Sequence, residues 1–374
     1  MESVDTQGAR VGEPHGAGEP DLIYLGRSRL HRSRANLIQT FGTVEGFEEL
    51  GVHVELWLPP WRRGVKLAAK LGELGVARAL DVRGSAWLHP RWGFWPFVLR
   101  YRRHLARARV LYTRVPEISA ALGAFGLRHH LEVHDVESLL GGRLGRRIVA
   151  MHRNGMVAML IPISHGAGRP LVEAGAVPGR VHVAPSGVRL ADFAGVSPFA
   201  VERLARPRIV HVGRLTPERG SQVLAALAQQ EWCEVTAVGG EEELPGVRNV
   251  PMVPLREVPA WYDRCDVTLL PYQPEIGTVA TMSPIKLFEA LAAGRPIVAS
   301  DLPTLREVLT HEQTALLVPP HDLEAWVAAV QRLRQEPALA LHLAESARQL
   351  APAYSWRARA QGILRAIGVP MEEG

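Results

Sequence analysis

The sequence is poor in cysteine and contains no long apolar run. Only two of its 374 residues are cysteines, Cys233 and Cys265, and they have neither metal-ligand spacing nor a C-x-x-C arrangement. We therefore expect a reduced, cytoplasmic protein without structural disulfides. The longest apolar run, "GMVAMLIPIS" at 155–164, is much shorter than the ~20 residues that span a bilayer. These absences argue against a disulfide scaffold, a cysteine-based metal site and a membrane-spanning helix.

The excess of basic over acidic residues is also small, since the net charge is only +5. Residues 1–200 contain 26 Arg and Lys against 17 Asp and Glu, whereas residues 201–374 contain 17 against 21. Because half of the chain is acidic, we expect no nucleic-acid partner, although the basic half keeps this as a lesser alternative. Residues 1–20 are polar and lack the basic end and apolar core of a signal peptide, so a disordered tail is expected there.

What the sequence does contain is short apolar runs that alternate with helical patterns such as 33–50, 96–107 and 116–126. The predicted strands are 21–26, 52–59, 108–114, 130–135, 159–164, 180–185, 208–213, 233–239, 267–272, 296–301 and 315–320. Strands that alternate with helices imply crossover connections and parallel sheets. With 47% hydrophobic residues, the chain is predicted to form two doubly wound α/β domains joined near residues 187–206.

The stretch "SPIKLFEALAAGRPIVASDLP" has clear signals for the two ends of a helix. Ser283 fits the helix cap, and Pro284 fits the first position because its φ is helical and its missing N–H would have no partner. Gly294 fits the left-handed residue after the helix. The pattern therefore predicts a helix over 284–293 and a strand over 297–300.

Charged residues in this helix and in a second loop indicate an anion site. A helix amino end favours a bound anion, and Lys286 and Glu289 share one face of the predicted helix. In "HVGRLTPERG" the chain turns at Gly213, which places Arg214 and Arg219 where guanidinium groups can bind phosphate oxygens. The alternatives are solvated surface arginines and an exposed pair between the lysine and the glutamate.

The segments "VGRLTPERG", "DVTLLPY", "SPIKLFEALAAGRPIVASDLPTLREVL" and "APSGVRLADF" together resemble the family-4 nucleotide-sugar glycosyltransferases. The resemblance implies the GT-B fold, in which two doubly wound Rossmann-like domains face each other across a cleft and a C-terminal helix crosses back to the first domain. The implied boundaries are an acceptor-binding domain over 21–190, a linker over 191–206, a nucleotide-sugar-binding domain over 207–354 and the returning helix over 355–374.

The resemblance also implies roles for the donor-binding residues. Arg214, Arg219 and Lys286 are expected to bind the donor diphosphate, and Glu289 to accept hydrogen bonds from the ribose hydroxyls. Gly213, at the turn, belongs to the same set.

One position of the donor set departs from the family. The family has an acid eight residues before Glu289, where this chain has Thr281. Either Glu275 supplies the missing carboxylate, or backbone N–H groups around Thr281 to Ser283 recognise the donor sugar. Pro284, at the start of the helix, belongs to the same donor-binding set.

In the first domain, the resemblance points to the ends of two strands. His134 in "LEVHD" matches a histidine that lies near the donor sugar in relatives, and Asp135 is a weaker candidate. Gly26 and Ser28 fall where the family's first loop approaches the diphosphate. In the following segment, Ser33 and Asn36 could face donor or acceptor.

The expected activity is transfer of a sugar from UDP or GDP to a glycan, lipid or small glycoside, with retention of anomeric configuration. No D-x-D triplet occurs, the nearest approach being Asp263 with Asp266, so no metal is expected, and no cofactor besides the donor. Two alternatives stay open: a catalytically degenerate sugar-nucleotide-binding protein, and a sugar-nucleotide epimerase on the same fold.

The stretch over 85–110 places aromatic residues in front of arginines. The aromatic residues are Trp87, Trp92, Phe94, Trp95 and Phe97, and the arginines are Arg100, Arg102, Arg103, Arg107 and Arg109. Such a stretch fits peripheral contact with an anionic membrane surface, including the inner face of the cell membrane. The slightly preferred interpretation is a helix whose aromatics enter the core and whose arginines are solvated.

Overall fold

The computed structural model describes residues 20–30, 35–62, 64–89, 91, 93–240 and 243–371. The chain separates into two compact units, the first formed by Met1–Ser186 with Trp356–Gly374 and the second by Gly187–Ser355. Most of the expected tail over 1–20, together with Ser33 and Trp92, lies outside the described residues. Within those residues, no helix has the length and apolar character needed to cross a membrane.

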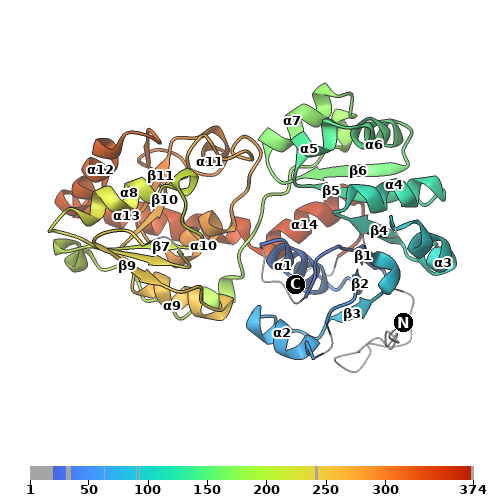
Figure 1. The fold of residues 1–374 in the computed structure, drawn as a ribbon, viewed down its shortest axis with the longest axis horizontal. Coiled ribbons are helices and arrows are strands. Elements are labelled where there is room, and N and C mark those ends of the chain that lie inside the picture. Colours follow the sequence, from blue (N-terminus) through green and yellow to red (C-terminus); the bar gives the residue numbers. More distant parts are fainter. Residues whose placement is uncertain are drawn as a thin grey trace. The chain divides into compact units, whose positions relative to one another are not determined.

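The first unit is built on a six-stranded sheet with the strand order β3-β2-β1-β4-β5-β6, in which all pairs are parallel (Figure 1). Its strands are β1 Leu22–Leu25, β2 Val54–Leu58, β3 Asp81–Gly84, β4 Val110–Thr113, β5 His129–Val133 and β6 Val157–Pro162. Its helices are α1 Ala35–Glu48, α2 Leu67–Glu73, α3 Trp95–Leu105, α4 Pro116–Ala124, α5 Val136–Leu140, α6 Arg143–Arg153, α7 His165–Glu173 and α14 Trp356–Ile367.

The second unit repeats this topology with the strand order β12-β11-β10-β7-β8-β9, again all parallel. Its strands are β7 Arg208–Val212, β8 Glu234–Val238, β9 Val247–Val250, β10 Val267–Leu270, β11 Ile297–Ser300 and β12 Leu316–Val318. Its helices are α8 Ser221–Ala228, α9 Val258–Asp263, α10 Ile285–Ala293, α11 Pro303–Arg306, α12 Leu323–Gln335 and α13 Pro337–Leu350. The predicted pair of doubly wound α/β domains is therefore confirmed.

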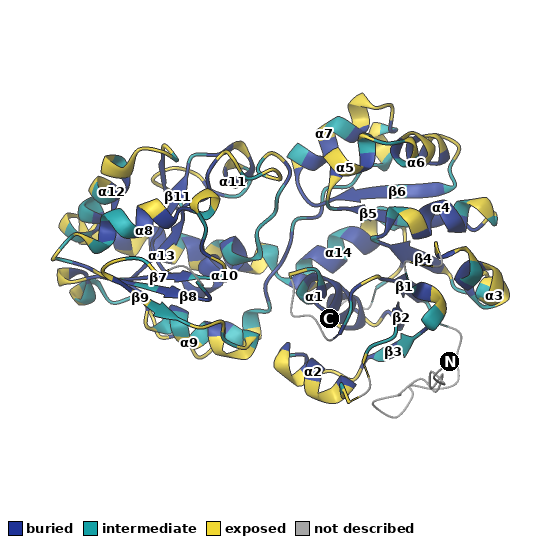
Figure 2. Cartoon of the chain, in the orientation of Figure 1, coloured by how far each residue is buried: buried dark blue, intermediate teal, exposed yellow. Residues whose placement is uncertain are grey.

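In both units the first strand lies in the middle of the sheet. The next two strands extend the sheet on one side of it, and the last three extend the sheet on the other side. The switch point lies between β1 and β4 in the first unit and between β7 and β10 in the second. The central strands are buried on both faces, which explains their continuous apolar runs (Figure 2). Ligands of doubly wound folds bind beyond the carboxyl ends of the strands at such a point.

The last helix packs onto the first unit through two glycines of α1. A Cβ at Gly42 would lie 2.4 Å from the indole of Trp356, and a Cβ at Gly46 would lie 2.4 Å from the carbonyl oxygen of Trp356. Glycine at these two positions, one turn apart, therefore lets α14 approach α1 closely (Figure 1). This is the C-terminal helix that the sequence predicts to return to the first domain.

Two edge strands form that the sequence does not predict, and one predicted strand does not form. β3 "DVRG" and β9 "VRNV" carry charged or polar side chains at the sheet edges, so neither contains an apolar run. The segment over 180–185 forms only an isolated bridge, between Val181 and Leu160. It donates two N–H groups to β6, but β6 ends at Pro162, which has no N–H to donate in return.

Candidate functional site

The charged residues that the sequence singles out in the second unit lie at the switch point of its sheet. Gly213 directly follows β7, and Pro271 directly follows the neighbouring strand β10. The backbone N–H of Gln273, in the loop after β10, donates to the carbonyl of Glu218, in the loop after β7, at 2.9 Å. The two loops that leave the carboxyl ends of these strands are thus held together where a ligand is expected.

Gly213 brings the backbone against the side chain of Lys286. Its φ is +120°, and a Cβ at this position would lie 2.2 Å from the Nζ atom of Lys286. Both the backbone conformation and the contact require glycine. The lysine therefore extends from the first turn of α10 to the end of β7, which brings the two predicted loops into one site.

The ammonium group of Lys286 is buried although the residue as a whole is half-buried. Its Nζ atom has no hydrogen-bond partner among the residues that the structure describes. The pKa of Lys286 is lowered from 10.5 to about 7, mainly by burial. The cations of Arg219 and Arg214 lower this pKa further, whereas Glu289 raises it. A buried donor without an acceptor is unfavourable, so this position suits an anionic ligand.

Glu289 is buried next to Lys286 and is only 7% exposed, which excludes the exposed-pair alternative. Burial raises the pKa of Glu289 to about 7, and Asp192 raises it further, while Lys286 opposes the shift. Asp192 itself pairs with Arg189 at 3.0 Å. The structure therefore brings Gly213, Arg214, Arg219, Lys286 and Glu289 together at the end of one strand, with Arg214 exposed and Arg219 half-buried.

The start of α10 differs slightly from the prediction. Pro284 is the cap residue with an extended ψ of 125°, so the helix begins at Ile285. The cap position is therefore one residue later than predicted, since the proline occupies it in place of Ser283. The predicted helix end is confirmed, since Gly294 has a left-handed φ of 59° and β11 begins at Ile297.

The structure shows how the residues around the missing acid are arranged. Thr281 is 3% exposed, and its hydroxyl lies 3.4 Å from the carbonyl oxygen of Thr278, to which it donates. The exposed carboxylate of Glu275 pairs with His321 at 3.2 Å. Glu275 is therefore engaged at the surface, and Thr281 is packed into its own loop.

Two buried residues near the site are missed by the sequence analysis. His211 lies in β7 and is 3% exposed, and burial, with Lys286 and Arg219, lowers its pKa well below 6.5. Tyr272 is 4% exposed. Burial and Glu289 raise its pKa, whereas Arg219 lowers it. The signal that could identify His211 is its position between apolar residues in the strand "RIVHV".

In the first unit, Gly26 and Ser28 follow β1 and serve the local packing. The Gly26 N–H donates to the Trp57 carbonyl at 2.9 Å, and a Cβ at Gly26 would lie 2.9 Å from the side chain of Leu58. Ser28 is 1% exposed, and its hydroxyl lies 3.3 Å from that of Thr40. The hydroxyl is thus directed toward α1.

His134, after β5, belongs to a buried polar cluster. Its Nε2 atom is hydrogen-bonded to Glu132, which accepts from the Tyr112 hydroxyl at 2.6 Å and pairs with Arg359 of α14 at 3.0 Å. Burial and Arg114 lower the pKa of His134 to about 4. At neutral pH the imidazole is therefore neutral, its Nε2–H donates to Glu132, and Nδ1 is an acceptor.

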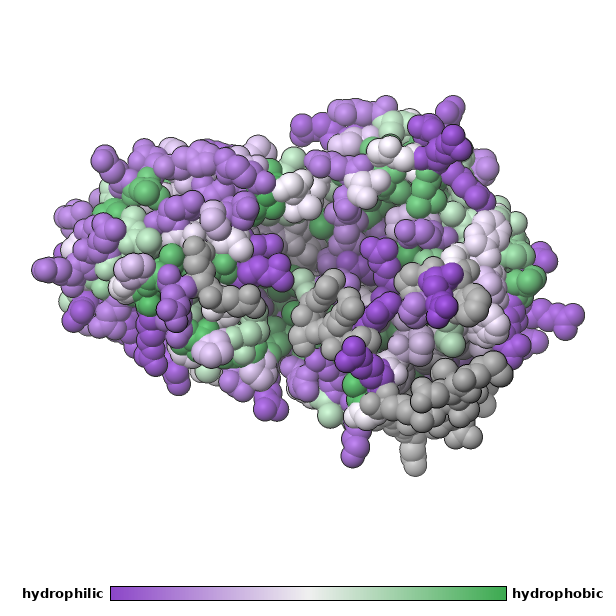
Figure 3. All heavy atoms as spheres, in the orientation of Figure 1, coloured by the Kyte–Doolittle hydropathy of each residue, from purple (hydrophilic) through white to green (hydrophobic). Residues whose placement is uncertain are grey.

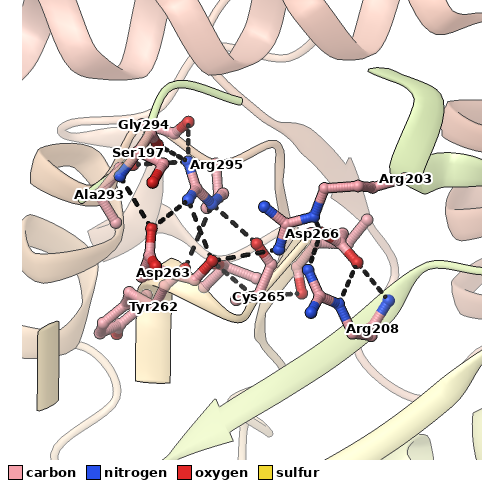
Figure 4. A network of polar contacts seen from close by, with 12 residues as sticks. Ser197, Arg203, Arg208, Tyr262, Asp263, Cys265, Asp266, Ala293, Gly294 and Arg295 are labelled. Carbon is pink, nitrogen blue, oxygen red and sulfur yellow. Dashed lines mark hydrogen bonds and ion pairs between the residues drawn. The ribbon is translucent and has the colours of Figure 1, made fainter. Parts of the chain in front are cut away.

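Asp263 and Asp266, the nearest approach to a D-x-D pair, are engaged by arginines (Figure 4). Asp266 is 1% exposed and pairs with Arg203 at 2.6 Å and with Arg208 at 2.8 Å. Asp263 accepts a hydrogen bond from the backbone N–H of Ser197 and lies 3.6 Å from Arg295. Both carboxylates thus link segments of the second unit.

Comparison with known proteins agrees with this geometry. Residues 206–336, which include β7 to β12, match the model of the family described as Glycosyl transferases group 1. Among its relatives, the D-inositol 3-phosphate glycosyltransferase of Streptosporangium roseum is 31% identical over 219 residues, 50% of this chain and 49% of the relative. The amylovoran biosynthesis glycosyltransferase AmsK of Erwinia amylovora is 29% identical over 196 residues, 47% of each chain.

The chain therefore spans about half the length of the curated relatives it matches. Solved structures cover more of it. The sucrose-phosphate synthase of Thermosynechococcus elongatus has a TM-score of 0.68 at 18% identity, covering 93% of this chain and 98% of that one. HepE of Anabaena, solved with UDP, has a TM-score of 0.68 at 15% identity, covering 93% and 99%. These likenesses support the two-unit GT-B fold.

Proposed function

We propose that the protein is a glycosyltransferase that moves a sugar from a nucleoside diphosphate to an acceptor. The group 1 match and the names of the curated relatives support the reaction class. The observation that carries the proposal is the buried ammonium of Lys286, which has no partner among the described residues and lies near two arginines at a switch point.

In this proposal, Arg214, Arg219 and Lys286 bind the diphosphate and stabilise the charge that develops on it as the sugar leaves. Preorganised cations of this kind commonly supply ~3–4 kcal/mol of barrier reduction per key group. Glu289 accepts hydrogen bonds from the ribose diol. Gly213 lets the backbone approach the phosphates, and N–H groups of Met282 and of the start of α10 bind the donor sugar. The Thr281 N–H is not among them, since it donates to the Thr278 carbonyl at 3.0 Å.

The first unit is proposed to bind the acceptor, which is a glycan, lipid or small glycoside. His134 is proposed to contact the donor sugar as a neutral imidazole, since its pKa of about 4 prevents it from acting as a proton donor at neutral pH. Gly26 and Ser28 are proposed to shape the loop beside the diphosphate. His134→Ala is expected to lower turnover more than it lowers donor affinity.

We further propose that the anomeric configuration is retained by a front-face route. The leaving phosphate accepts the proton of the acceptor hydroxyl, so no side chain has to act as a covalent nucleophile. Nuclear magnetic resonance of the first product formed from an α-linked donor tests this, with an α-linked product expected. An initial β-linked product would contradict the proposal.

The reaction is proposed to need no metal ion, because three cations and a helix amino end neutralise the diphosphate. Asp263 and Asp266 are already paired with arginines, which makes them unsuitable as a metal-binding pair. Turnover is expected to continue in excess chelator. Complete loss of turnover, restored by added Mg²⁺, would overturn this part of the proposal.

The donor is tested first with UDP-sugars, since HepE was solved in complex with UDP and with UDP-glucose. A thermal-shift screen of UDP- and GDP-sugars is expected to show stabilisation by one nucleotide, because a ligand of the native state raises the unfolding temperature. The same donor is expected to lose most of its turnover with Arg214→Ala. Activity within a few fold of wild type would refute the role of Arg214.

A catalytically degenerate binding protein is the second candidate, and Thr281 in place of the family's acid favours it. Transfer or hydrolysis of a labelled nucleotide sugar separates the two candidates. Binding without either reaction, over a broad acceptor panel, would support the degenerate protein.

A further inference from the structure

The aromatic stretch before the arginines divides between the core and the surface. Phe94 and Phe97 are 3% and 0% exposed, as the core interpretation expects. Trp95 and Leu99, by contrast, are 42% and 63% exposed, and Trp87 is 40% exposed. The interpretation that all these aromatics enter the core is therefore wrong for the two tryptophans.

Trp95 and Leu99 lie one turn apart on the outer face of α3, and Arg102 and Arg103 follow on the next turn. The Trp95 ring is 5.7 Å from the Phe125 ring at the end of α4, and the guanidinium of Arg147 in α6 lies 5.7 Å from the Trp95 ring centroid. We call these six residues the α3 patch. Hydrophobic and hydrophilic side chains lie beside one another on the edge of the first unit where α3 lies (Figure 3).

The chain segment that contains α3 carries charge of one sign. Residues 82–116 contain eight arginines and no Asp or Glu, and Arg100, Arg102, Arg103, Arg107 and Arg109 are all exposed. The next acid in the chain, Glu117, lies 3.9 Å from Arg27. An anionic lipid surface strengthens binding about fivefold for each arginine that reaches it.

We propose that the α3 patch docks the protein on an anionic lipid bilayer, with α3 lying in the plane of the interface. Trp95 and Leu99 then enter the headgroup region while the arginines contact lipid phosphates. A nucleic acid would satisfy the arginines but would leave the aliphatic Leu99 side chain without a partner. The proposal concerns the first unit alone and does not depend on the donor site.

Co-sedimentation with vesicles tests the proposal. Wild type is expected to bind vesicles that contain phosphatidylglycerol, less so in high salt, and to stay in solution with pure phosphatidylcholine. Trp95→Ser with Leu99→Ser is expected to weaken binding at least about tenfold, because two apolar side chains lose their burial. Arg102→Glu with Arg103→Glu is expected to remove most of the salt-sensitive binding.

The matched controls lie in the second unit. Leu341, which is 38% exposed, is changed to Ser, and Arg332, whose side chain is 39% exposed, is changed to Glu. These variants are expected to bind as wild type does. Circular dichroism checks that each variant is folded. Absence of sedimentation with anionic vesicles at low salt would overturn the proposal. So would undiminished binding by the folded Trp95/Leu99 variant, or binding to DNA in place of vesicles.

Discussion

The two units each bury a cluster of charges, and the clusters differ in whether the buried cation makes hydrogen bonds within the protein. In the first unit, the Arg359 guanidinium donates to Thr43 and to the Pro185 carbonyl, both at 2.8 Å, and its Nη2 atom forms an ion pair with Glu132 at 3.0 Å without a hydrogen bond. In the second unit, the Lys286 ammonium has no hydrogen-bond partner among the described residues. The cation of the first cluster is thus held by protein groups, whereas that of the second is suited to a ligand.

The pKa values reflect this difference. Burial alone would raise the pKa of Glu132, but the Arg359 cation and the hydrogen bond to His134 outweigh it and lower the pKa well below 4.5. For Lys286 and Glu289, burial outweighs the attraction between the two charges, so both pKa values move to about 7. We infer that a buried charge held by an opposite charge and hydrogen bonds supports the fold, and that one without hydrogen bonds marks the binding site.

The largest expected effect is on stability and comes from breaking the first cluster. Arg359→Met leaves Glu132 buried without its cation, which is expected to cost ~3–5 kcal/mol of the free energy of unfolding. Urea denaturation measures the loss. The exposed Arg357 of the same helix is the matched control, and a loss no larger than that of Arg357→Met would contradict the comparison.

The opposite result is expected at the second cluster. Lys286→Met removes an unpartnered buried charge, so the free energy of unfolding is expected to stay the same or rise, while turnover falls ~10²–10³-fold. Urea denaturation and a transfer assay on the same preparation check both parts. Turnover within a few fold of wild type, or a stability loss like that of Arg359→Met, would remove the distinction between the clusters.

A smaller effect is expected at the glycine beneath the lysine. A Cβ added by Gly213→Ala displaces the ammonium, so affinity for a nucleoside diphosphate is expected to fall about tenfold, or ~1.4 kcal/mol. Gly195→Ala is the control, because a Cβ there meets nothing within 4 Å. Equal affinities of the two variants in an equilibrium titration would show that the Gly213–Lys286 contact does not matter.

The smallest effect is on the pH dependence of stability. Between pH 7 and 10.5 the unfolded chain binds more protons at Lys286 than the folded chain does, so this residue makes stability rise with pH across that window. The raised pKa of Glu289 has the opposite effect between pH 4.5 and 7, where stability falls as pH rises. The stability advantage of Lys286→Met over wild type is therefore expected to shrink as pH rises above 7. A constant advantage would contradict the lowered pKa of Lys286.

The alternation of apolar runs and helical patterns is sufficient to predict two doubly wound units, because buried parallel strands leave continuous apolar runs in the sequence. The edge strands β3 and β9 escape this signal, since an edge strand tolerates charged residues. The segment around Val181 shows the opposite case. It is an apolar run that is predicted as a strand but does not form one, because Pro162 at the end of β6 has no N–H to donate to it. Pairing at an edge is decided by the partner strand and is not visible in the segment itself.

For the candidate site, residue type and local spacing predict Arg214, Arg219, Lys286 and Glu289. The contact between Gly213 and Lys286 cannot be predicted from spacing, because the two residues are far apart in sequence and meet only after β7 and β10 pair. The same holds for Asp192, which raises the pKa of Glu289 from a distant segment. Burial is likewise a tertiary property, so the shifted pKa values are visible only in the fold.

The proposed role of Lys286 is tested most directly by a calorimetric titration of UDP and GDP into wild type, Lys286→Met and the control Arg332→Met, at a pH above 7. We predict that one nucleotide binds to wild type and to the control with uptake of close to one proton, because a bound diphosphate raises the lowered pKa of Lys286. Lys286→Met is predicted to bind at least about tenfold more weakly and without proton uptake. Equal binding by all three proteins, or binding without a change in protonation, would contradict the claim that this unpartnered ammonium is the ligand site.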